Sequence, residues 1–175
     1  MKIRRARKSD EREYLLLLDQ LVGSNSCSKS SAPAFRKALK NRSSILLCAE
    51  DGAGKVFGVE TLLVVEAIRA NGRRVIIDEL VVDSAHRGKG IGSALVAEAI
   101  SIAKKLRAKS IWVASGVFRA AAHRLYLRSG FKYYEHNFRM NLDGTKINFP
   151  PGFDPDLAYE GAQREINKEL EKLPK

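Results

Sequence analysis

The sequence is poor in the residues that build disulfide frameworks and metal centres. Its 175 residues include only two cysteines, Cys27 and Cys48, and three histidines. The two cysteines have the spacing of neither a disulfide framework nor a metal-binding pattern. We therefore expect no metal ion, and a reduced, cytoplasmic setting is the default. Cys48 has no histidine near it in sequence, which indicates a small buried side chain and not a nucleophile.

Long apolar runs are also missing. No stretch approaches the roughly 20 apolar residues that a helix needs to span a bilayer. The basic start, MKIRRARK, is followed at once by Asp10 and Glu11, which argues against a secretory or transit signal. The sequence therefore predicts neither a membrane span nor a membrane partner.

Acidic residues are too few to balance the basic ones, and the formal net charge is +11. Such an excess suits nucleic acid, acidic lipid or a polyanionic cofactor as a partner. The chain has no run of five or more like charges and no RNA-binding motif with interleaved aromatic residues. A basic nucleic-acid-binding domain therefore stays open as an alternative that rests on charge alone.

The apolar pattern predicts one domain of ordinary size in the α/β class, with an α+β mixed sheet. Apolar runs predict strands over residues 2–6, 45–50, 56–65, 75–82 and 110–115. Helical spacing predicts helices over residues 9–22, 33–40, 90–107 and 119–129, with Ser9 as an N-cap and residues 23–31 as a polar loop. Successive strands form an antiparallel meander, and the helix before residues 110–115 makes the last two strands a parallel pair.

The C-terminal part has a different organisation. Residues 132–142 predict a final strand or strand pair, and residues 148–153 form a linker with two prolines and a glycine. Asp154 then caps a last helix, whose narrow apolar stripe should dock on the body or on a second copy of the chain. We therefore expect a domain over residues 1–145 and an extension over residues 146–175, with a homodimer left open.

The most informative stretch is residues 75–102, in which an apolar strand feeds a helix through a glycine-rich turn. Unpaired N–H groups at the start of a helix, together with the helix dipole, favour a bound anion there. Neither the dinucleotide fingerprint nor the P-loop pattern fits this turn. The pattern that does fit is R-x-x-G-x-G, formed by Arg87, Gly90 and Gly92.

On these residues the chain resembles the GNAT superfamily of acyl-CoA-dependent N-acetyltransferases, whose signature [QR]-x-x-G-x-[GA] follows a strand and opens a helix. A second stretch, RAAAHRLYLRSGF from residue 119, is similar to the family pattern N-x-x-A-x-x-L-Y followed by a small residue, Gly and Phe. Arg119 stands where the family usually has Asn. The resemblance covers about residues 3–142 and implies the GNAT fold, in which strand 75–82 carries a bulge and splays from strand 110–115.

The resemblance also implies acetyl-CoA as the co-substrate, held in the cleft between the splayed strands. A backbone N–H near Val81 would take the acetyl carbonyl, and Tyr126 would be the general acid. The cofactor-binding residues implied in this way are Leu80, Val81, Val82, Arg87, Gly88, Lys89, Gly90, Ile91, Gly92, Ser93, Arg119 and Ala122.

Two adjacent carboxylates, Asp78 and Glu79, interrupt an otherwise apolar strand. Regular alternation along a strand would place them on opposite faces of the sheet. Because an unpaired buried carboxylate is costly, at least one of them should face a cleft. The other interpretation, in which one faces solvent and the other forms a structural ion pair, stays open.

These features together predict an N-acetyltransferase that moves an acetyl group from acetyl-CoA to a primary amine by direct attack in a ternary complex. Glu79 is the first candidate for the general base and Asp78 the second. The carboxylates of Asp78, Glu79, Glu60 and Glu66 suggest a cationic acceptor, either a polyamine-like amine or a peptide amine. The alternative is a regulatory module that binds CoA without chemistry, which Arg119 in place of Asn favours.

Overall fold

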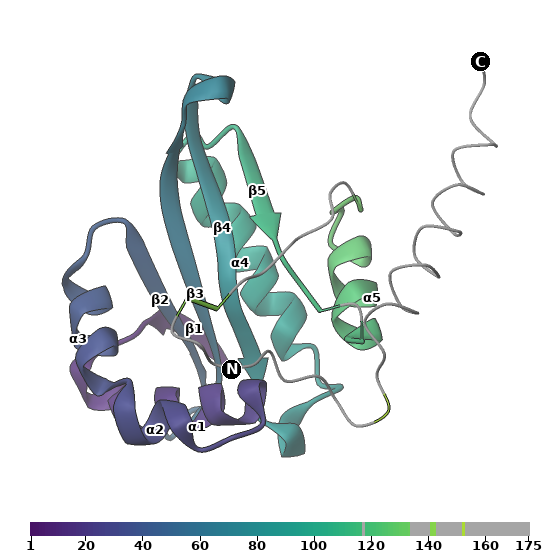
Figure 1. Cartoon of the computed structure of the whole chain (residues 1–175). Helices are drawn as coiled ribbons and strands as arrows, with labels where there is room; N and C mark the ends of the chain where they lie inside the picture. Colours follow the sequence, from purple (N-terminus) through teal and green to yellow (C-terminus); the bar gives the residue numbers. More distant parts are fainter. Residues whose placement is uncertain (117, 134–140, 143–151, 153–175) are drawn as a thin grey trace. The chain divides into compact units, whose positions relative to one another are not determined.

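The computed structural model describes residues 1–116, 118–133, 141–142 and 152. These residues fall into two compact units (Figure 1). The first unit comprises residues 1–114 and 124–132, and the second comprises residues 115–123 and 133–175. The predicted division at residue 145 stays a prediction, because residues 143–151 and 153–175 lie outside the described residues.

The first unit is built on a five-stranded sheet in which the spatial order of the strands follows the chain. Its members are β1 (Lys2–Arg5), β2 (Ser44–Glu50), β3 (Val56–Ala67), β4 (Gly72–Val82) and β5 (Ser110–Val113). Neighbouring strands are antiparallel from β1 to β4, whereas β4 and β5 are parallel. The predicted mixed sheet, a meander joined to one parallel pair, is therefore confirmed.

Helices cover both faces of this sheet (Figure 1). On one face α4 (Ile91–Lys105) packs its apolar stripe, including Leu95 and Ala99, against Val75, Ile77 and the inner side chains of β2 and β3. On the other face α1 (Glu11–Val22) and α3 (Ala32–Lys40) enclose a second core. The two cores therefore share β2, β3 and β4, which fixes both sides of these strands.

Two local predictions around α1 are wrong. The N-cap of α1 is Asp10 and not Ser9, because residues 8–10 form a 3-10 turn in which the Asp10 carboxylate accepts a hydrogen bond from the Arg7 backbone N–H. The predicted polar loop contains a short helix, α2 (Ser26–Ser30). The Asp19 carboxylate stabilises the start of α2 by accepting a hydrogen bond of 2.8 Å from the backbone N–H of Cys27.

The last described helix, α5 (Ala120–Arg128), begins in the second unit and ends in the first. Its end is a Schellman motif, since the N–H of Gly130 bonds to the Leu127 carbonyl and the N–H of Phe131 bonds to the Tyr126 carbonyl. Gly130 has a φ of +92°, which glycine adopts without strain. The strand predicted over residues 132–142 and the helix predicted after Asp154 fall largely or wholly outside the described residues. No helix among the described residues is long and apolar enough to cross a membrane.

Candidate active site

The site begins where β4 loses its parallel partner. The pairing of β4 with β5 runs from Arg74 opposite Ser110 to Ile77 opposite Val113 and then stops. Strand β4 continues to Val82 and stays paired with β3 on its other side. Residues 78–82 therefore present one backbone edge that β5 does not cover. Unpaired backbone groups of this kind need other partners.

A bulge in β4 lies at the same point. Thr61 of β3 is opposite Glu79 and the next residue, Leu62, is opposite Ile77, so Asp78 is the extra residue. The bulge shifts the alternation of side chains by one position. Before it, Ile77 faces the core under α4, and after it, Leu80 faces the same core. A bulge is a common way for a strand to re-aim side chains next to a functional site.

The bulge brings Asp78 and Glu79 to the same face, which corrects the prediction that they occupy opposite faces. Glu79 lies on the same face as Val81, the face that α1 covers. The negative charge of Asp78 raises the pKa of Glu79. Burial raises the pKa of Glu79, the hydrogen bond from Thr61 lowers it, and the Asp78 charge raises it. Burial also raises the pKa of Asp78. The two carboxylates therefore form one acidic pair.

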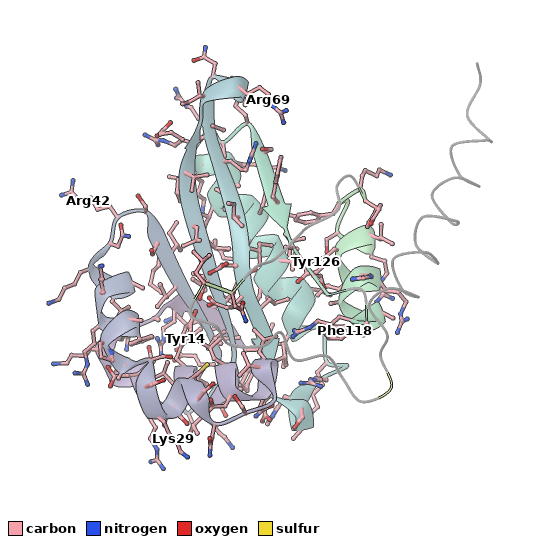
Figure 2. All side chains as sticks on the ribbon, in the orientation of Figure 1. Tyr14, Lys29, Arg42, Arg69, Phe118 and Tyr126 are labelled. Atoms are coloured by element: carbon pink, nitrogen blue, oxygen red, sulfur yellow. The ribbon has the colours of Figure 1, made fainter. Side chains whose placement is uncertain are left out.

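Thr61 is also hydrogen-bonded to a residue of α1. The hydroxyls of Thr61 and Tyr14 lie 2.8 Å apart, and both residues are buried. Tyr14, labelled in Figure 2, comes from α1, so this hydrogen bond joins the helix to the sheet next to the bulge. Burial raises the pKa of the Tyr14 phenol well above its usual range. The Tyr14 phenol therefore keeps its proton at neutral pH.

The glycine-rich turn follows β4 as predicted. Gly88 and Gly90 have φ values of +77° and +79°, and Gly90 is the N-cap of α4. A side chain at either position would meet no atom within 4 Å, so the turn lies open above the first turn of α4. The side chains of Arg87 and Lys89 are exposed and donate hydrogen bonds to the backbone carbonyls of Val82 and Ala85.

At the start of α4 the packing is tight. The side chain of Ile91 is buried in the core, whereas Ser93 is exposed. A Cβ at Gly92 would lie 3.2 Å from the Cδ2 of Leu125, so the end of α5 packs directly beside this turn of α4. Tyr126, the residue after Leu125, is 9% exposed and its ring lies 5.8 Å from that of Phe131. Figure 2 labels Tyr126 on α5.

The sequence of the site region matches a known family. The model of the acetyltransferase (GNAT) family matches residues 9–131. The chain belongs to the GNAT acetyltransferase family. No curated protein matches the chain significantly.

Solved structures of GNAT type resemble the chain over most of its length. A provisionally named acetyltransferase from Agrobacterium tumefaciens is 25% identical, with a TM-score of 0.74, over 81% of this chain and 99% of its own. A transcriptional regulator from Bacillus halodurans is 26% identical with a TM-score of 0.73, over 81% and 99% of the two chains. A ribosomal-protein-alanine N-acetyltransferase from Brucella melitensis is 18% identical with a TM-score of 0.68, over 81% and 100%, and it shows the fold alone.

Two of the acidic residues predicted to line the GNAT cleft lie elsewhere. Glu60 faces the core under α4, between Gly58 and Leu62, and is fully buried. Burial, reinforced by the charge of Glu98, raises the pKa of Glu60 to about 8. Glu66 lies towards the far end of the β3–β4 hairpin and pairs with Arg73 at 3.4 Å. Both predictions were wrong because the sequence alone does not show which face of β3 each carboxylate occupies.

The sequence analysis also missed residues that anchor the glycine turn of this GNAT domain. Asp83 accepts a hydrogen bond from the Gln20 amide, and the Gln20 oxygen accepts one from the backbone N–H of Ser84. The His86 ring lies 2.7 Å from Asp83 and stacks on Phe57. These contacts fix the start of the turn to α1. An Asp-Ser pair directly after a strand is a capping signal that would have pointed to Asp83.

Arg119 and Ala122 belong to the second unit, and their role in cofactor binding stays a prediction. The Arg119 guanidinium lies 5.6 Å from the centre of the Phe118 ring. Among the described residues, no group of three or more histidines, cysteines or acidic residues could hold a metal ion.

Proposed function

We propose that this protein is an N-acetyltransferase that moves the acetyl group of acetyl-CoA to a primary amine by direct attack in a ternary complex. The observation that carries the proposal is the acidic pair at the bulge, on the strand that parts from β5 there and leads into the glycine-rich turn. Membership of the GNAT family supports transfer of an acetyl group. The chemistry of the pair supports an amine as the acceptor.

The residues around the turn fit the pyrophosphate of CoA. The first turn of a helix carries N–H groups with no partner inside the helix, and the N-terminal residues of α4 are Ile91, Gly92 and Ser93. The glycine conformations at residues 88 and 90 leave space for an anion close to the backbone. Arg87 and Lys89 supply positive charge. The open backbone edge at Leu80, Val81 and Val82 would hold the amide groups of the pantetheine arm.

The proposed transfer forms a bond between the amine nitrogen and the acetyl carbon and breaks the thioester bond to sulfur. A lysine-like amine has a pKa of about 10 and is mostly protonated at neutral pH, so it must lose a proton before it attacks. Glu79 takes this proton as the general base, with Asp78 as the second candidate. A backbone N–H near Val81, on the edge of β4 that β5 leaves uncovered, would stabilise the oxyanion. Tyr126 would give a proton to the departing thiolate.

The acidic pair also bears on the class of acceptor. Two carboxylates on one face attract a cation, and the partial burial of Glu79 strengthens this attraction because it limits the access of water. A polyamine-like amine or a basic peptide amine therefore fits the site better than an acidic acceptor. Glu60 and Glu66 take no part in this argument, because the structure places them away from the pair.

Thiol release from acetyl-CoA, measured with a panel of polyamines, lysine peptides and N-terminal peptides, tests the proposal. We expect turnover with at least one amine of the panel, and a loss of at least 100-fold in Glu79→Gln, because a positioned base contributes about that factor or more. Glu66→Gln is the matched control, since its carboxylate is exposed, and it should keep full activity. Absence of turnover on the whole panel would contradict the proposal.

A regulatory module that binds acetyl-CoA without turnover is the second candidate. It is favoured by Arg119 at the usual position of an asparagine and by the likeness to a structure named as a transcriptional regulator. Stabilisation by acetyl-CoA without thiol release would support this candidate.

A further inference from the structure

A row of hydrogen-bonding side chains crosses three elements next to the bulge. Glu79 of β4 and Thr61 of β3 are directly opposite each other in the register, so their side chains are neighbours on one face of the sheet. The Thr61 hydroxyl lies 2.8 Å from the Tyr14 hydroxyl of α1. Tyr14 is 1% exposed and Thr61 is 8% exposed. The row therefore lies in the protein interior, with the carboxylate at its outer end.

Simple counting of protons fixes the direction of these hydrogen bonds. An ionised carboxylate can only accept, so a hydrogen bond between these two side chains requires the single proton of the Thr61 hydroxyl to point at Glu79. The Thr61 oxygen is then left as an acceptor, and Tyr14 must be the donor in the bond between the two hydroxyls. Each bond in the row is thus directed towards the carboxylate. Hydrogen bonds arranged in such a chain strengthen one another.

We propose that Thr61 and Tyr14 are positioning residues for the base Glu79, and that they hold its carboxylate in one orientation at the acidic pair. This inference rests on the proposed function. Tyr14 ends the row inside the core, so the row orients the base and is no path for a proton to solvent. Thr61 and Tyr14 act through Glu79 and need not touch either substrate.

The charged and polar groups around Glu79 oppose one another. Asp78 on its own strand makes the ionised form of Glu79 less favourable, as does burial, whereas the hydrogen bond from Thr61 on β3 favours it. Tyr14 from α1 acts on Glu79 through Thr61, and the Glu79 charge in turn raises the pKa of Tyr14. Without the Thr61 hydroxyl, burial and the Asp78 charge would raise the pKa of Glu79 with no hydrogen bond from Thr61 to lower it. The ionised base would then form only at higher pH.

Titration of the Glu79 side-chain carboxyl by carbon-13 NMR tests this inference without any need for turnover. The resonance is assigned by its loss in Glu79→Gln. In Thr61→Val, which keeps the shape of the side chain, we expect the midpoint of the Glu79 titration to rise by about one pH unit, because a hydrogen bond to a charged group has been removed. Thr61→Ser restores the hydroxyl and should restore the midpoint. Tyr14→Phe should raise the midpoint by a smaller amount.

The outcomes separate this inference from the proposed function. An unchanged midpoint in Thr61→Val overturns the positioning role, and so does a Thr61→Ser protein that behaves like Thr61→Val. If Thr61→Val fails to fold, Thr61→Ser and Tyr14→Phe decide the question. A wild-type midpoint in both of these variants overturns the role of Tyr14. A midpoint that is raised in Tyr14→Phe alone supports that role. If the midpoint shifts but the protein acetylates no amine, the positioning role of Thr61 and Tyr14 is supported and only the proposed N-acetyltransferase function is contradicted.

With an active acceptor, the same variants give a second readout. The acid limb of the pH profile of kcat/KM should move to higher pH in Thr61→Val by the same amount as the NMR midpoint. The KM for acetyl-CoA should stay unchanged, because Thr61 lies on β3 and not at the glycine turn. A purely structural role would lower activity at all pH values without moving the profile.

Discussion

The stability of Glu60→Gln relative to wild type should rise with pH. Glu60 is fully buried under α4, and neither carboxylate oxygen has a hydrogen-bond partner within the described residues. Burial raises its pKa from the ordinary value of 4.5 to about 8, with Glu98 adding to the shift. The folded protein therefore holds a proton on Glu60 that the unfolded chain gives up at neutral pH.

The sign of the effect follows from this difference in proton binding. Because the folded state binds more protons than the unfolded state between pH 4.5 and about 8, the free energy of unfolding falls as pH rises through this window. Each unit of pH lowers the free energy of unfolding by up to about 1.4 kcal/mol, so the total loss reaches about 3 kcal/mol near neutral pH. Glu60→Gln has no proton to lose and avoids this cost.

Urea unfolding of the two proteins at several pH values measures the effect. The difference in free energy of unfolding between Glu60→Gln and wild type should grow by about 3 kcal/mol from about pH 5 to about pH 8. Glu66→Gln is the control, because its carboxylate is exposed and its difference from wild type should stay nearly constant with pH. A constant difference for Glu60→Gln over the same range would refute the reasoning.

Three further predictions concern other parts of the first unit. Asp10→Asn should lower the free energy of unfolding by about 2 kcal/mol in urea, because it weakens a buried pairing with Arg4 at 2.7 Å, and an unchanged value would contradict this role. In the native protein one thiol should react quickly with a disulfide reagent, namely Cys27, since Cys48 is fully buried and burial raises its pKa to about 12; two fast thiols would contradict this. Gly92→Leu should lower the melting temperature and weaken acetyl-CoA binding, because its Cβ would crowd Leu125, and wild-type binding would show that the turn tolerates bulk.

The glycine turn and the end of α5 could be predicted because their signals are local. Arg87, Gly90 and Gly92 define the turn by identity and spacing alone, and the structure places Arg87 and Gly90 between β4 and α4 and Gly92 in the first turn of α4. Gly130 and Phe131 define the Schellman ending in the same way, and its two hydrogen bonds are present. A pattern of a few adjacent residues is enough when the backbone conformation depends on those residues only.

The environment of the carboxylates could not be predicted because it depends on contacts between strands. The alternation rule assumes a regular strand, and one extra residue at Asp78 reverses it for all of residues 79–82. Glu60 looked like a cleft residue until the register placed it under α4. The residue opposite Glu79 in the sheet is Thr61, which lies 18 positions before it in the sequence and is hydrogen-bonded to Tyr14, still further away. No local pattern contains this information.

The most direct test of the central claim is the melting temperature with and without acetyl-CoA in wild type, Gly90→Trp and Gly54→Trp. Gly90 and Gly54 both have positive φ values and open space around them, so the two variants carry similar backbone strain, but only Gly90 lies in the turn. A ligand at about 100 times its Kd adds about 2.7 kcal/mol of stability, which raises the melting temperature by several degrees. We predict this rise in wild type and Gly54→Trp and its loss in Gly90→Trp. No rise in wild type, or an equal rise in Gly90→Trp, would contradict acetyl-CoA binding at this turn.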